Sequence, residues 1–151
     1  MKEKIKNIFY LFFPIFLGGI VGFIISGNID YEQLNQPLLS PPSIVFPIVW
    51  TILYLLIGIT YYLIQKKEPL SRNEKIIYYL QLFVNILWPV FFFLLKARGF
   101  SILWILLLDV LVFLLLRIIY KKDKKISYLL IPYLIWCIFA TYLNIGVYLL
   151  N

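Results

Sequence analysis

The hydrophobic positions of this chain fall into five long runs separated by short polar segments. The runs cover residues 5–25, 42–64, 75–95, 100–120 and 126–150. Each is long enough to cross the hydrocarbon core of a bilayer as an α-helix, which takes about 20 residues. They are apolar on every face, whereas the strands of a membrane barrel alternate apolar and polar residues. The pattern therefore predicts an all-α polytopic membrane protein, in which residues 1–151 form one domain, a bundle of five transmembrane helices.

The second run has the most regular pattern of the five. Ser40 is a suitable N-cap and Pro41 suits a first helical position, so we expect this helix to start at the Pro41-Pro42 pair. Steps of three and four place one set of residues on a single face: Pro47, Trp50, Tyr54, Ile57, Gly58 and Tyr61. We expect the other helices to close around this aromatic face.

Polar and aromatic residues also share faces on the third and fifth runs. The third run carries Gln81, Asn85, Trp88 and Phe92, and the fifth carries Tyr133, Trp136, Cys137, Ala140 and Asn144. Amides in hydrocarbon are costly unless they are hydrogen-bonded, so these faces should point into the bundle. On the fifth run the small residue and the amide leave a shaped gap beside a flat indole, and the same pattern is compatible with helix packing alone.

Small residues and one acid mark two further helix faces. Gly18, Gly22 and Ser26 recur every four residues, which gives a flat strip for close helix contact within the monomer or between two copies. Asp109 is the only acidic residue well inside a run, and desolvation favours its neutral form. It is either a ligand or proton site, or a protonated acid hydrogen-bonded to a neighbouring helix.

Several local signals concern the connections. The sequence from Ser71 to Glu74 is a capping box that marks the start of the third helix. Pro89 predicts a distortion of that helix, and residues 96–99 predict a tight turn into the fourth. The first loop, residues 27–40, is the longest connection, and it is either a lid over the bundle or a solvated connector.

The net charge of +7 is explained by membrane topology. If the chain alternates sides, one side holds twelve of the fourteen Lys and Arg residues: Lys2, Lys4, Lys6, Lys66, Lys67, Arg72, Lys75, Arg117, Lys121, Lys122, Lys124 and Lys125. The positive-inside rule then places the N-terminus in the cytoplasm and the C-terminus outside. The basic side is therefore expected to contact lipid headgroups, and no nucleic-acid partner is expected.

Conventional catalytic groups are absent from the sequence. It contains no His, and its single Cys137 excludes an internal disulfide and a cysteine metal cluster. No Ser/His/Asp arrangement or phosphate-binding loop is present. We expect no metal site and no required cofactor, and whether the protein is an enzyme stays open.

Three segments resemble the signature segments of the TspO/MBR family, the tryptophan-rich sensory proteins related to the mitochondrial translocator protein, formerly called the peripheral benzodiazepine receptor. They are SPPSIVFPIVWTILYLLIG at residues 40–58, QLFVNILWPVFFF at 81–93 and PYLIWCIFATYLN at 132–144. The resemblance spans nearly the whole chain in the family's order, and the five helices and long first loop agree with it.

The resemblance implies a pocket that opens toward the first loop and binds porphyrins such as protoporphyrin IX, together with isoquinoline carboxamide and benzodiazepine-type ligands. Trp50 and Trp136 match the paired indoles of that pocket. The other matching ligand-binding positions are Tyr31, Pro42, Tyr54, Asn85, Trp88 and Ala140.

Two positions depart from the family pattern. Ile44 stands where many members have Trp, which removes an aromatic contact on the side of the first loop. No Lys or Arg follows Tyr148, so the cholesterol-recognition pattern of the animal proteins is incomplete.

Three functions fit this reading of the sequence. The protein is a membrane receptor or transporter for tetrapyrroles, or it degrades protoporphyrin IX in a light- and oxygen-dependent reaction with Trp50 and Trp136 as redox partners, or it is a ligand-sensing stress regulator. Its expected partners are porphyrin and lipid-like small molecules, membrane lipids and, as is usual in the family, a second copy in a homodimer. Because Met1 leads almost directly into the first run without a transit peptide, we expect a bacterial plasma membrane.

Overall fold

The computed structural model describes all 151 residues and contains helices but no strands. The helices are α1 (Lys2–Ile25), α2 (Val45–Lys67), α3 (Arg72–Pro89), α4 (Arg98–Lys122), α5 (Lys124–Ser127) and α6 (Ile131–Leu150), with short helical turns η1 (Ser26–Asn28), η2 (Tyr31–Gln33), η3 (Val90–Leu94) and η4 (Tyr128–Leu130). Five segments are long and apolar enough to cross a membrane, the fifth of them formed by α5, η4 and α6 together. The predicted all-α protein with five spans is therefore confirmed.

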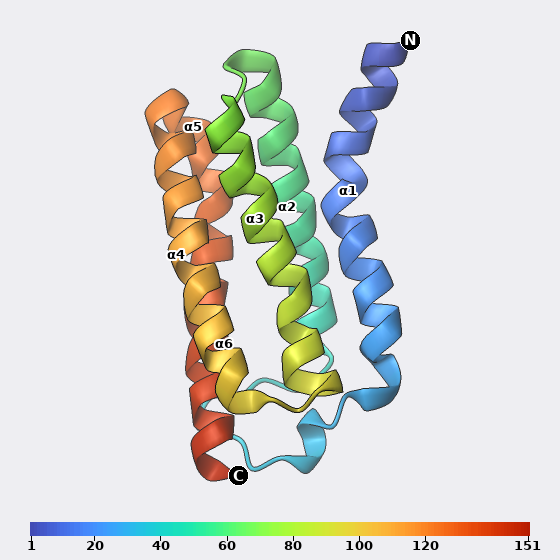
Figure 1. Ribbon diagram of the computed structural model, residues 1–151, viewed down its shortest axis with the longest axis vertical. Coiled ribbons are helices and arrows are strands. Elements are labelled where there is room, and N and C mark those ends of the chain that lie inside the picture. The colour runs from blue at the N-terminus through green and yellow to red at the C-terminus, as the bar shows by residue number, and fades with distance from the viewer.

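The spans run up and down in one elongated bundle, with the two termini at opposite ends (Figure 1). α1 packs against α2 and also contacts α3, α3 packs against α4, and α4 packs against α6. We call the end with the N-terminus and the α2–α3 and α4–α5 connections the basic end. The opposite end, which holds the first loop (residues 26–44) and the α3–α4 turn, is the first-loop end.

α1 is the most peripheral helix of the bundle. Only Pro14 and Ile25 are buried on it, whereas α2 buries seven residues and shares the main apolar core with α3, α4 and α6. Most of the outward-facing side chains of α1 are large and apolar, as expected for a helix that contacts lipid. The position of α1 therefore depends mainly on its contact with α2.

The start of α2 differs from the sequence-based expectation. The helix begins at Val45 and not at the Pro41-Pro42 pair, and Ser40 does not cap it, because the Ser40 hydroxyl donates to the Pro37 carbonyl at 2.7 Å. A residue that precedes proline is disfavoured in helical conformation, so Pro42 opposes a helical conformation at Pro41, the expected first residue of the helix. The segment up to Ile44 is therefore part of the first loop.

The start of α3 follows the predicted capping box. The Ser71 hydroxyl accepts from the Glu74 backbone N–H at 3.3 Å, and the Glu74 carboxylate accepts from the Ser71 N–H at 2.7 Å. These two bonds satisfy donors that the first helical turn leaves free. α3 begins at Arg72, three residues before the apolar run that predicted it.

The distortion predicted at Pro89 is present as one π-helical turn, η3, from Val90 to Leu94. In this turn the Leu95 N–H donates to the Val90 carbonyl, five residues back. The chain then reverses through Lys96, whose φ of 52° is left-handed, and α4 begins at Arg98. The predicted tight turn is present but ends at Ala97, because Arg98 and Gly99 already belong to α4.

Candidate ligand cavity between α1, α2 and α3

The distance between α1 and α2 grows from the basic end toward the first-loop end. A Cβ atom built on Gly58 of α2 would lie 1.9 Å from the Leu11 carbonyl oxygen of α1, so the two backbones touch there. Tyr54 lies one turn from Gly58 on α2, toward the first-loop end. A Cβ built on Gly18 of α1 would lie 2.3 Å from the Tyr54 ring. A Cβ on Gly22 would meet nothing within 4 Å. The two helices therefore separate beyond Tyr54.

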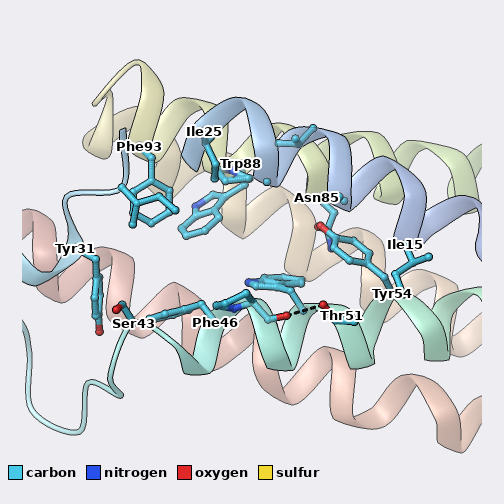
Figure 2. A pocket seen from close by; sticks show the side chains of 18 residues that line it. Ile15, Ile25, Tyr31, Ser43, Phe46, Thr51, Tyr54, Asn85, Trp88 and Phe93 are labelled. Carbon is cyan, nitrogen blue, oxygen red and sulfur yellow. Dashed lines mark hydrogen bonds between the residues drawn. The ribbon is translucent and has the colours of Figure 1, made fainter. Parts of the chain in front are cut away.

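The separation encloses a cavity of about 420 Å³. Its wall is formed by α1, the first loop, α2, the end of α3 and η3: Ile15, Gly18, Gly19, Val21, Gly22, Ile25, Ile29, Tyr31, Ser43, Phe46, Pro47, Trp50, Thr51, Tyr54, Asn85, Trp88, Pro89 and Phe93. Tyr54 and Asn85 lie at its inner end, and Tyr31 and Phe93 lie toward the first loop (Figure 2). The wall contains no Asp, Glu, Lys or Arg.

A buried hydrogen-bond network forms the inner end of the cavity. The Tyr54 hydroxyl donates to Asn85 Oδ1 at 2.7 Å, and Asn85 Nδ2 donates to the Tyr133 hydroxyl at 2.6 Å. Tyr133 donates in turn to Gln81 Oε1 at 2.7 Å. The network joins α2, α3 and α6 and is built from phenols and amides alone. It can hold a polar group of a ligand, but it contains no carboxylate or imidazole that could act as a general base.

Aromatic rings form the side walls. The Trp50 ring lies 5.8 Å from Tyr54 at an interplanar angle of 30°. On α3, the Trp88 indole N–H donates to Asn144 Oδ1 of α6 at 2.8 Å, which fixes the ring while its face remains part of the wall. Rings held in this way present flat apolar surfaces with little freedom to lose on binding.

Tyr31 and Phe46 close the cavity toward the first loop. Their rings meet edge to face with centroids 4.9 Å apart, and Tyr31 is almost fully buried. Burial raises the pKa of the Tyr31 phenol, so its hydroxyl remains a protonated donor, and that hydroxyl has no hydrogen-bond partner in the structure. The Gln36 amide donates to the Tyr31 carbonyl at 2.8 Å and holds this part of the loop.

Comparison with known proteins identifies the architecture. Residues 10–150 match the model of the TspO/MBR family. The chain is 38% identical over 122 residues to tryptophan-rich protein TspO of Archaeoglobus fulgidus, covering 80% of this chain and 79% of that protein. It is 37% identical over 143 residues to the translocator protein homolog of Schizosaccharomyces pombe, covering 91% and 87%. It is 30% identical over 118 residues to the human translocator protein, covering 76% and 70%.

The chain belongs to the TspO/MBR family. The resemblance found in the three sequence segments is thus confirmed, and the five apolar spans and the family membership together make the chain a multi-pass membrane protein.

In this TspO/MBR protein, five of the eight predicted ligand-binding residues meet at the cavity: Tyr31, Trp50, Tyr54, Asn85 and Trp88. The other three, Pro42, Trp136 and Ala140, do not line it. Ala140 lies at a second, much smaller cavity of about 20 Å³, whose wall shares Tyr31, Phe46, Trp88 and Phe93 with the first. The role of all eight residues in binding stays a prediction.

The TspO/MBR structure places Trp50 but not Trp136 in the wall of this cavity, and the expected pairing of the two indoles around a ligand stays a prediction. Trp136 lies behind Phe46, with the two rings edge to face at 5.9 Å, and Phe46 is the residue that lines the cavity. Asn85 bonds to Tyr54 and Tyr133 and to neither indole. Trp136 Nε1 is buried without a partner.

The sequence analysis missed the contribution of α1 to the cavity wall. It interpreted the Gly18, Gly22 and Ser26 strip as a packing surface, and only Gly18 packs closely, against Tyr54. Gly22 instead borders the empty space. Phe46 precedes Trp50 by one helical turn, so extension of the aromatic stripe by one step would have found it.

Asp109 is separate from this site. Its carboxyl group meets the Thr141 hydroxyl of α6 at 2.7 Å and does not line the cavity. Of the two interpretations of this acid, the structure therefore supports a hydrogen bond between neighbouring helices.

Proposed function

We propose that this protein binds flat, conjugated, largely apolar molecules in the cavity between α1, α2 and α3, with porphyrins such as protoporphyrin IX and isoquinoline carboxamide or benzodiazepine-type compounds as its ligands. The observation that carries the proposal is the cavity itself, with Trp50 and Trp88 in its walls and the Tyr54–Asn85 bond at its inner end. Each aromatic contact contributes about 0.5–1.5 kcal/mol beyond the burial of area.

The size of the cavity supports such ligands. Small-molecule sites commonly measure about 300–1,000 Å³, and the cavity of about 420 Å³ falls in this range. A larger ring system gains space if Phe46 turns aside, because Phe46 lines both this cavity and the small one beside Ala140. Ala140 would then join the wall from α6.

The position of the cavity along the bundle favours one direction of ligand exit. The cavity lies on the first-loop side of the Gly58–Leu11 contact, where the backbones of α1 and α2 touch. With the basic end in the cytoplasm, as the charge asymmetry favours, the site faces the outer side of a bacterial plasma membrane. Passage to the cytoplasm would require α1 and α2 to part at Gly58, so a receptor role needs less rearrangement than transport.

Titration of the purified protein with protoporphyrin IX, followed by quenching of tryptophan fluorescence, tests the proposal. Gly22 lines the cavity and a Cβ there meets nothing within 4 Å, so Gly22→Leu should fill part of the cavity and weaken binding about tenfold, as expected for an overpacked site. Gly27→Leu is the matched control, because a Cβ there also meets nothing within 4 Å and Gly27 does not line the cavity. Equal affinity of wild type and Gly22→Leu would place the site elsewhere, and loss of binding in Ala140→Leu alone would place it beside α6.

Light-dependent degradation of bound porphyrin is the second candidate function. It is favoured by Trp50, whose indole forms part of the cavity wall and could donate an electron to an excited ligand, with dioxygen as the oxidant. Trp136 is further from such a ligand, behind Phe46. Illumination with protoporphyrin IX should therefore bleach the ligand more slowly in Trp50→Phe than in Trp136→Phe. Bleaching of bound ligand by Trp50→Phe at the wild-type rate would exclude this function.

A further inference from the structure

A cluster of three charged residues lies at the first-loop end, where the loop meets the α3–α4 turn. Arg98 Nη2 lies 2.5 Å from Asp30 Oδ2, and Lys96 Nζ lies 3.5 Å from the same oxygen. Lys96 and Arg98 are the two basic residues outside the basic end. The Arg98 side chain is only 17% exposed, and its guanidinium lies over the Phe92 ring at 5.5 Å.

The charges and hydrogen bonds of this cluster do not balance. Two cations share one carboxylate, which leaves an excess of one positive charge. The nearest other acid in the loop, Glu32, accepts instead from the Ser43 N–H at 3.1 Å, and the side chain and backbone of Ser43 together lower the pKa of Glu32. Arg98 Nε and Asp30 Oδ1 are both buried without a partner. A guanidinium that uses one edge only retains donors for a second anion.

The cluster adjoins the ligand cavity. Asp30 stands between Ile29 and Tyr31, which both line the cavity wall. Phe92, beneath the guanidinium, contacts Phe93 with centroids 4.8 Å apart, and Phe93 lines the wall as well. Because the wall itself contains no charged side chain, an acidic ligand would find an opposite charge only at Lys96 and Arg98.

We propose that Lys96 and Arg98 form a carboxylate-binding site for acidic ligands of the cavity, and that Asp30 occupies this site until a ligand carboxylate replaces it. The proposal rests on the proposed function, since it assumes that a ligand occupies the cavity. Arg98 is held in place for this role through its backbone, because its carbonyl accepts from the Ser101 hydroxyl at 2.7 Å and from Asn144 Nδ2 at 3.2 Å.

Replacement of Asp30 would also release one attachment of the first loop. Other attachments would remain at the end of α6, where Asn35 bonds to Asn151 and the Leu38 carbonyl accepts from the Tyr142 hydroxyl at 2.6 Å. The segment around Asp30 would thus be released, while Tyr31 keeps its bond to Gln36 and the rest of the loop stays attached. Specificity for acids and local opening of the loop would then depend on the same residues.

The test compares protoporphyrin IX, which carries two carboxylates, with its uncharged dimethyl ester. The measured quantity is the ratio of ester to acid dissociation constants, in which changes of cavity shape common to both ligands cancel. Wild type should favour the acid. Arg98→Gln should lower the ratio by about tenfold or more, as expected for loss of a hydrogen bond to a charged group, and Asp30→Asn should raise it. Lys122→Gln, at the basic end, should leave it unchanged.

The outcomes separate this inference from the proposed function. If wild type binds neither compound, the proposed function fails. If it binds both but shows no preference for the acid, or if Arg98→Gln and wild type give the same ratio, the carboxylate site is wrong. Should Arg98→Gln not fold, Lys96→Gln is the first variant to replace it, and Arg98→Lys, which keeps the charge, should retain more of the preference than Lys96→Gln. The preference should then fall in the first variant, and a full preference there would contradict the proposal.

Discussion

In the half of the α1–α2 pair near the basic end, Gly58 lies against the backbone of Leu11, whereas in the other half Gly22 lies beside open space. The first half is closely packed, and the Tyr10 ring of α1 meets the Tyr61 ring of α2 edge to face with centroids 4.9 Å apart. The second half holds the cavity. The backbone of α1 lies opposite Gly58, whereas open space lies opposite Gly22. Small residues therefore bring these helices into contact in one half and leave space between them in the other.

The largest effect should follow from Gly58→Ala, which breaks the close contact. The added Cβ would lie 1.9 Å from the Leu11 carbonyl oxygen, so α1 must move away. Overpacking commonly costs about 1–3 kcal/mol, and a clash with backbone belongs at the upper end of this range. We expect the free energy of unfolding in detergent micelles to fall by about 3 kcal/mol.

Gly22→Ala, on α1 in the half that holds the cavity, is the matched control. Its Cβ meets nothing within 4 Å, so its free energy of unfolding should stay within about 0.5 kcal/mol of wild type. Equal losses in the two variants would contradict the difference between the halves.

An intermediate effect is expected for Asn85→Leu, at the boundary between the halves. Asn85 links Tyr54 of α2 with Tyr133 of α6, and its removal leaves the Tyr54 hydroxyl buried without an acceptor. An unpaired buried polar group costs about 1–3 kcal/mol, so we expect the free energy of unfolding to fall by about 2 kcal/mol.

Tyr54→Phe in the Asn85→Leu background is the second arm of this measurement. It removes the stranded hydroxyl and should restore part of the lost stability. If Tyr54→Phe lowers the free energy of unfolding by the same amount in the Asn85→Leu background as in wild type, the two side chains are not coupled. The hydrogen bond between them then does not stabilise the protein.

The smallest effect concerns Asp123, which connects α4 with α5 at the basic end. Its pairing with Lys67 and its acceptance of the Ile126 N–H at 2.9 Å lower its pKa. Because the pKa is lower in the folded state than the unfolded value of about 3.9, the contribution to stability is present above that value and is lost as the pH falls through the folded pKa.

Asp123→Asn should therefore melt slightly below wild type near neutral pH, and the two melting temperatures should converge in acid. Lys66→Gln serves as the control, since Lys66 contacts Tyr62 and pairs with no carboxylate. A constant difference between Asp123→Asn and wild type at every pH would show that the ion pair is not its source.

The sequence predicted the helices well because each rests on a local signal. The five apolar runs, the Ser71 capping box and the distortion after Pro89 depend on neighbouring residues alone. The predicted start of α2 was wrong because the N-cap at Ser40 and the first helical position at Pro41 were considered without Pro42, which disfavours a helical Pro41. In that case two local rules conflicted.

The cavity was less predictable because it depends on where two helices separate. Helical spacing correctly placed Trp50 and Tyr54 on one face of α2, and Asn85 and Trp88 on one face of α3. It could not show that α1 rather than α6 stands opposite them, nor that Phe46 separates Trp136 from the cavity. Likewise, one glycine strip contains both Gly18, which packs, and Gly22, which does not.

The uncharged wall of the cavity also determines how binding responds to acidity. The chain has no His, and no Asp, Glu, Lys or Arg side chain lines the wall. In the orientation proposed above, the site faces surroundings whose pH the cell does not control. A neutral ligand would nevertheless meet the same hydrogen-bond donors and the same electrostatic field in mildly acidic and mildly alkaline water. Affinity for such ligands should therefore be constant between about pH 6 and pH 8, a range that lies between the ordinary pKa values of carboxylates and phenols.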